Sequence, residues 1–167
     1  MSRLMSVALT TDAVRRREKT VTRRVGWLML RPGDQVTLCP KVRGRRRGEP
    51  LERIVTVDVV SVRRERLDQI SPDDVIAEGC VGMSPGEFVD FFCSTHRGVV
   101  ADSEVTRIEW SYPRICRACG CTDYAACDTI FGPCAWQQAY DDNTGLCTGC
   151  TAPGVVTGGG GRSDHDC

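Results

Sequence analysis

The pattern of hydrophobic and polar residues predicts mostly strands in the first two thirds of this chain. Five strands are expected, over residues 4–9, 20–25, 35–39, 51–62 and 99–112. The segment 51–62 holds six β-branched apolar residues, a run too rich in valine for a stable helix. We therefore expect it to be the central strand. Pro113 closes the last strand and ends this part of the chain.

Three short helices are predicted from the residues at their ends. Thr10 or Thr11, followed by Asp12, can cap a basic helix that ends near Glu18. The sequence Ser71-Pro72-Asp73-Asp74 has a capping serine, a first-position proline and acids in the first turn, and Gly79 ends that helix. These elements together predict a small α+β domain over residues 1–113, with a curved or barrel-like sheet.

The third predicted helix follows a capping box formed by Ser84 and Glu87, and it ends at Gly98. One of its faces carries five residues that we interpret as packing residues: Phe88, Val89, Phe92, Cys93 and His96.

Composition gives the setting of the protein. The chain has 167 residues, of which 41% are hydrophobic, and no apolar run approaches the roughly 18 to 20 residues that span a bilayer. Its N-terminus lacks an apolar stretch suited to secretion. We therefore expect a cytoplasmic protein without membrane contact. Because that compartment is reducing, its eleven cysteines favour metal ligation over disulfides.

The net charge is zero, but the charges are separated along the chain. Residues 1–47 hold thirteen Lys and Arg against three Asp and Glu, whereas residues 48–167 hold nine against nineteen. The basic front indicates a phosphate-bearing or otherwise anionic partner.

The basic residues concentrate in two segments. Residues 17–34 place Lys19, Thr22, Arg23 and Arg24 ahead of an Arg-Pro-Gly-Asp turn. Residues 41–48 form a glycine-flanked loop with three consecutive arginines, Arg45, Arg46 and Arg47, that could hold phosphates. For both segments a solvated basic surface without a partner is the alternative.

The first basic segment also carries a motif. With the Arg-Pro-Gly-Asp turn, the valine-rich strand and Ala77-Glu78-Gly79, it resembles an ASCH domain of the PUA-like superfamily. Many members of that family show Gly-x-Lys-x-x-Glu-x-Arg at this point. Here Lys19 and Arg24 match, while Arg17 and Thr22 stand in place of the glycine and the glutamate.

A threonine at the glutamate position is similar to the branch that acts as N(4)-acetylcytidine amidohydrolase. The resemblance implies a catalytic set of Lys19, Thr22 and Glu78. Thr22 would be the nucleophile, Lys19 the base, and Glu78 the acid that protonates the leaving nitrogen. The alternative is a non-catalytic PUA-like module that binds RNA or a modified base, with Arg23, Arg24 and the arginine loop supplying affinity.

A separate cysteine-rich module is predicted over residues 114–150. Two Cys-x-x-Cys pairs, Cys116 with Cys119 and Cys147 with Cys150, can complete a four-sulfur zinc site. Cys121, Cys127 and Cys134 are additional candidates that could form a second site or exchange with these ligands, and an iron–sulfur cluster is the alternative. They could equally be buried small hydrophobic residues.

The module is poorly suited to binding a phosphate backbone, because residues 114–150 contain two Arg and four Asp. A structural role with a protein partner is expected instead. Residues 151–167 include four consecutive glycines and are predicted to be a disordered tail.

Overall fold

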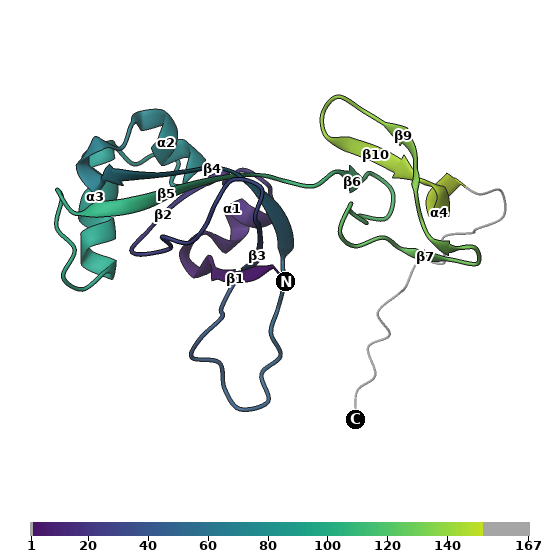
Figure 1. Cartoon of the computed structure of the whole chain (residues 1–167), viewed down its shortest axis with the longest axis horizontal. Helices are drawn as coiled ribbons and strands as arrows, with labels where there is room; N and C mark the ends of the chain where they lie inside the picture. The colour runs from purple at the N-terminus through teal and green to yellow at the C-terminus, as the bar shows by residue number, and fades with distance from the viewer. Residues whose placement is uncertain (1, 152–167) are drawn as a thin grey trace. The chain divides into compact units, whose positions relative to one another are not determined.

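The computed structural model describes residues 2–151, which form two compact units, one ending at Tyr112 and the other beginning at Pro113 (Figure 1). Residues 152–167 of the predicted tail lie outside the described residues. Thr151 is the last residue of a short helix.

The first unit is built on one mixed sheet in the order β1-β3-β4-β5-β2. Its strands are β1 (Arg3–Ser6), β2 (Val21–Arg24), β3 (Gln35–Cys39), β4 (Val55–Arg66) and β5 (Glu104–Ser111). β1 runs parallel to β3, and the other neighbours are antiparallel. The α+β class is therefore confirmed. β1 and β2 are the two edges, so the described strands form an open sheet and not a closed barrel.

Three strand bounds differ from the sequence prediction, each for a local reason. β1 ends at Ser6 because residues 8–10 form a 3-10 helix. β4 begins four residues late and continues to Arg66, since its charged end pairs with β5. There Arg64 donates to Thr106 Oγ1 at 2.8 Å. β5 begins only at Glu104, because Ser103 closes a turn by accepting the Val100 N–H.

The helices of the first unit are α1 (Thr11–Arg15), α2 (Pro72–Ala77) and α3 (Pro85–Thr95). α1 is shorter than predicted, because it ends at Arg15 and not near Glu18, and its N-cap Thr10 makes no side-chain capping hydrogen bond. The Ser71 hydroxyl accepts the Asp74 N–H, and Ser84 and Glu87 form the predicted capping box. α2 and α3 lie together at one end of the sheet (Figure 1).

Two apolar clusters hold the first unit together. One packs β1, β3, β4 and β5 against α1 and includes Met5, Val14, Leu38, Val57 and Ile108. The other joins α2 and α3 to β5 and includes Leu67, Val75, Phe88, Phe92 and Val105. Because Phe88 and Phe92 pack in this cluster together with Val105, α3 is fixed against β5.

The second unit has short strands and a core of sulfur. Its elements are β6 (Ile115–Cys116), β7 (Asp128–Thr129), β8 (Gly132–Pro133), β9 (Trp136–Ala139), β10 (Thr144–Cys147) and α4 (Thr148–Thr151). The buried cluster in its described residues consists of Cys116, Cys121 and Cys147, packed against four further cysteine and tryptophan side chains. Such a core lacks the aliphatic area that stabilises ordinary small domains.

Candidate functional site

A cavity of about 230 Å³ lies in the first unit, among the end of β1, β2, the end of α2 and one face of α3. Lys19, Thr22 and Glu78 all line it, as do Arg23 and Arg24. The remaining lining residues are Ser6, Val7, Ala8, Leu9, Thr10, Cys80, Phe88, Phe91, Phe92, Thr95 and His96. The residues named by the ASCH resemblance thus share one cavity.

Lys19 and Glu78 form a buried ion pair. Lys19 Nζ donates to Glu78 Oε2 at 2.6 Å and to the Glu78 backbone carbonyl at 2.6 Å. Only 2% of Lys19 and 4% of Glu78 is exposed. The backbone before β2 is fixed as well, because the Tyr112 hydroxyl donates to the Lys19 carbonyl at 2.6 Å. A proton can therefore pass directly between the Lys19 amine and the Glu78 carboxylate.

Gly79 permits this pairing. It follows Glu78 at the end of α2 with φ of +79°, a conformation that side chains other than glycine rarely adopt. A Cβ at this position would lie 2.7 Å from Ala13 Cβ and 3.5 Å from Lys19 Cβ. Glycine thus lets the end of α2 approach α1 and Lys19 closely.

Thr22 lies on β2, next to Lys19 in the cavity wall, and is 4% exposed. Among the hydrogen bonds of residues 2–151, none joins its hydroxyl to Lys19. The hydroxyl is thus in the cavity but not in direct contact with the amine.

Arg23 is enclosed by carboxylates. Its guanidinium pairs with Glu65 at 2.6 Å, with Glu78 at 3.3 Å, and with Asp74. Its side chain is completely buried. Arg23 thereby holds the Glu78 carboxylate beside Lys19. Its contact with substrate or nucleic acid stays a prediction.

Asp74 and Arg107 complete this charge network, and the sequence did not reveal either role. β2 and β5 pair in a register that sets Arg23 opposite Arg107. Asp74 accepts two hydrogen bonds from Arg107, at 2.7 and 2.8 Å, and another from Arg23. The hydrogen bonds from Arg107, and then those from Arg23, hold the pKa of Asp74 far below its usual range. Asp74 thereby offsets the repulsion between two arginines.

Arg24 also lines the cavity. One guanidinium nitrogen donates to the Ser6 carbonyl, but the buried Nε has no hydrogen-bond partner in the described part of the chain. Burial lowers the pKa of Arg24, and the charge of Glu78 opposes that effect.

One face of α3 supplies an aromatic wall. Phe88, Phe92 and His96 are spaced four residues apart and all line the cavity. The rings of Phe92 and His96 stack with centroids 4.0 Å apart and planes 9° apart. His96 Nδ1 lies 3.0 Å from the Phe92 carbonyl, and in the tautomer that carries its proton on Nδ1 it donates a hydrogen bond to that carbonyl. The face predicted only to pack thus also borders the cavity.

The arginine loop lies elsewhere. Arg45, Arg46 and Arg47 are exposed, in the connection that projects from the sheet between β3 and β4 (Figure 1). Arg45 donates to the Glu49 carbonyl at 3.0 Å, and the Arg46 N–H donates to Glu49 Oε2 at 2.6 Å. None of the three lines the cavity.

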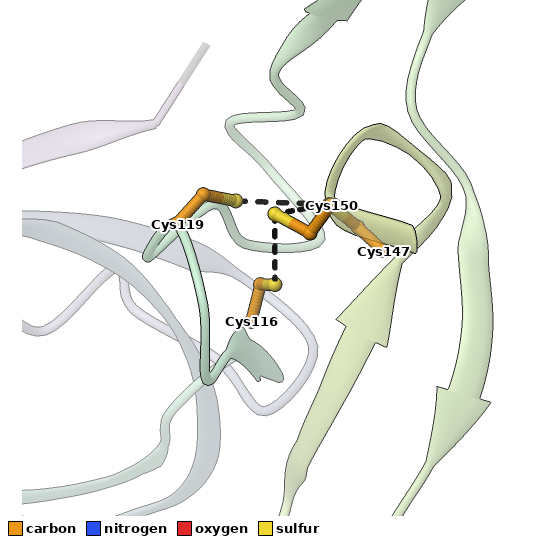
Figure 2. Close-up of side chains that lie close together, drawn as sticks. All are labelled: Cys116, Cys119, Cys147 and Cys150. Carbon is orange, nitrogen blue, oxygen red and sulfur yellow. Dashed lines mark hydrogen bonds between the residues drawn. The ribbon is translucent and has the colours of Figure 1, made fainter. Parts of the chain in front are cut away.

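The four predicted metal ligands of the second unit converge. Cys116 and Cys119 come from the segment that starts in β6, and Cys147 and Cys150 from the junction of β10 with α4 (Figure 2). Their sulfur atoms all lie within 4.8 Å of one another. Such a set of four thiols can hold one tetrahedral ion.

The additional candidates lie against the same group. Cys119, Cys121, Cys127 and Cys147 form a second set within the same 4.8 Å limit. Cys134 lies 3.6 Å from the Cys121 sulfur. For Cys147, burial acts to raise the pKa, but hydrogen bonds from neighbouring thiols outweigh it and lower the pKa to about 6. For Cys121 and Cys150 burial dominates and raises the pKa.

No family model matches the chain, and no curated protein matches it. A solved ASCH domain is similar to it. That protein, from Lactobacillus crispatus JV V101, is 17% identical in sequence, and its crystal structure matches with a TM-score of 0.44. The match covers 62% of this chain and 70% of the Lactobacillus chain. This likeness is too slight to assign a family. No described helix has the length and apolar character needed to cross a membrane.

Proposed function

We propose that the first unit binds a modified nucleoside, free or in RNA, and hydrolyses the amide of an acylated cytidine. The observation that carries this proposal is that Lys19, Thr22 and Glu78 line one cavity, with Lys19 and Glu78 in direct hydrogen bond. The motif resemblance to ASCH domains supplies the substrate class.

In the proposed reaction the Thr22 oxygen attacks the amide carbonyl carbon while its proton passes through one water to Lys19 Nζ, because no hydrogen bond of the described residues joins the two groups directly. Lys19 can accept it once the proton it shares with Glu78 Oε2, 2.6 Å away, has moved to the carboxylate. The protonated Glu78 then gives its proton to the departing nitrogen as the C–N bond breaks. Water hydrolyses the resulting acyl-threonine and restores the Thr22 hydroxyl.

The cavity suits a small, flat, polar ligand. Its volume of about 230 Å³ is below the roughly 300 Å³ at which drug-sized sites begin. The stacked Phe92 and His96 rings offer an apolar face, and Arg24 brings a guanidinium to the same cavity wall. A single nucleoside fits this description better than an oligonucleotide.

The test is a hydrolysis screen of N(4)-acylated cytidines with the full chain. Thr22→Ala should lower kcat by at least about 10²-fold, while Thr22→Ser retains activity. Thr95→Ala is the matched control, because Thr95 also lines the cavity but bonds only to its own helix and to His96. Equal activity in Thr22→Ala and the parent would exclude Thr22 as nucleophile.

A second candidate function is recognition without catalysis. It is favoured by the missing hydrogen bond between Thr22 and Lys19, and by the pairing of Lys19 Nζ with two Glu78 oxygens. In that function the cavity would hold a modified base while Arg45–Arg47 contact the RNA backbone. Tight binding of acylated cytidine with no turnover by the parent protein would select this function.

For the second unit we propose structural zinc held by Cys116, Cys119, Cys147 and Cys150, with an iron–sulfur cluster as the alternative. The convergence of four sulfurs in a unit without an aliphatic core supports it. We also propose that this unit contacts a protein partner. Ile130 and Phe131, at the turn between β7 and β8, are 92% and 93% exposed and could form the centre of that contact.

A further inference from the structure

The seven clustered cysteines of the second unit are too few for two separate sites but too many for one. Two independent four-sulfur sites would need eight ligands. The two close sets in the described residues, Cys116/Cys119/Cys147/Cys150 and Cys119/Cys121/Cys127/Cys147, use six cysteines because they share Cys119 and Cys147. Two tetrahedra that share two corners share one edge.

The sulfur separations agree with shared tetrahedra. With a zinc–sulfur distance of about 2.3 Å, the edge of a tetrahedral four-sulfur site is about 3.8 Å. The shared pair, Cys119 and Cys147, is 3.6 Å apart. In the first set Cys147 lies 3.6 Å from Cys150, and Cys116 lies 3.9 Å from Cys150. In the second, Cys127 lies 3.7 Å from Cys147.

We propose that the second unit binds two zinc ions in one cluster, with the Cys119 and Cys147 thiolates bridging them. This rests on the structural zinc role proposed above and extends it. Two ions and six thiolates carry a net charge of −2, the same as one ion with four thiolates. The second ion is therefore accommodated without adding charge to a segment that already holds four Asp against two Arg.

A glycine beside the cluster supports the second set independently. A Cβ at Gly149 would lie 2.9 Å from Cys127 Sγ and 3.7 Å from Cys147 Sγ. The absent side chain lets the Cys127 sulfur approach the Cys147–Cys150 turn. Cys127 is thus packed as a member of the cluster and not as an ordinary buried residue.

Cys134 is the natural control. It lies outside both sets, although its sulfur is 3.6 Å from that of Cys121 and accepts the Cys127 N–H at 3.3 Å. We assign it a positioning role, orienting Cys127 and Cys121 without binding an ion. Cys134→Ser should therefore keep both ions, whereas Cys127→Ser should lose one.

The experiment is metal analysis of the full chain purified without oxygen, followed by exchange of zinc for ¹¹³Cd and NMR. The expected result is two zinc ions per chain, and two cadmium signals with scalar coupling through the shared sulfurs. The cadmium measurement uses the parent protein, so it decides the question even if Cys127→Ser does not fold.

Several results would overturn the inference. One zinc per folded chain leaves the structural zinc proposal intact but removes the second ion, and no bound metal removes both. Two uncoupled cadmium signals exclude bridging thiolates. If Cys134→Ser binds only one zinc ion, Cys134 is a ligand and the assignment of the two sets is wrong. If the protein contains iron and acid-labile sulfide, the unit holds an iron–sulfur cluster and not zinc.

Discussion

Gly79→Ala tests whether the end of α2 must approach Lys19 as closely as the structure shows. A left-handed backbone costs an alanine about 1–2 kcal/mol. The new Cβ would also lie 2.7 Å from Ala13 Cβ, and overpacking of this kind costs about 1–3 kcal/mol. The two effects together lower the free energy of unfolding by about 2–5 kcal/mol.

Gly82→Ala is the matched control. Gly82 has φ of +92°, but nothing lies within 4 Å of the position of its Cβ. Gly82→Ala should therefore lower the free energy of unfolding only by the cost of a left-handed alanine, about 1–2 kcal/mol. Urea unfolding of the parent and both variants measures the difference as a shift in midpoint at unchanged slope. Ala13→Gly removes the Cβ that a Gly79→Ala side chain would meet. In the Ala13→Gly background, Gly79→Ala should therefore cost only the backbone part of the unfolding free energy.

Equal losses in Gly79→Ala and Gly82→Ala would refute the close approach, since only the shared backbone effect would remain. A double variant with Ala13→Gly that recovers nothing would do the same. Activity or ligand affinity should fall only in Gly79→Ala, because the Glu78 carbonyl and carboxylate that meet Lys19 directly precede this residue.

Two further predictions concern charge. Replacing Arg45–Arg47 with Ala should reduce the slope of log RNA affinity against log salt by up to about two to three units, whereas an unchanged slope makes the loop a solvated hairpin. Arg107 and Arg23 lower the pKa of Asp74 in the folded protein, so the ionised Asp74 carboxylate stabilises the fold. This contribution to the free energy of unfolding is complete above about pH 4, the ordinary pKa of an aspartate, and is lost as the pH falls below that value. Asp74→Asn should destabilise the protein by roughly 3 kcal/mol at pH 7, and its unfolding free energy should fall less steeply than the parent's on acid titration.

Local features of the fold could be predicted from the sequence. The caps of α2 and α3 depend on residues within one helical turn, and both were visible in the order of Ser, Pro, Asp and Glu. The cysteine pairs were visible for the same reason. Strand ends were less predictable, because the charged end of β4 is stabilised by partners on β5.

The charge network could not be predicted, since it depends on strand register. Asp74 by itself reads as a first-turn acid of α2, and only the pairing of β2 with β5 brings Arg23 and Arg107 to it. Arg17 illustrates a partial success. The resemblance places a glycine there, and Arg17 indeed has a left-handed φ of 61°, with its guanidinium 5.3 Å from the Tyr112 ring centre.

The strand order has a consequence for synthesis on the ribosome. β2 carries Thr22 and Arg23, and it pairs only with β5, the last strand of the first unit to be made. Such long-range pairing delays folding. Every cavity-lining residue precedes residue 97, yet among the described strands β2 has no strand to pair with until Glu104–Ser111 has left the exit tunnel. A nascent chain truncated before β5 would therefore contain all the residues of the cavity and still be unable to bind its ligand.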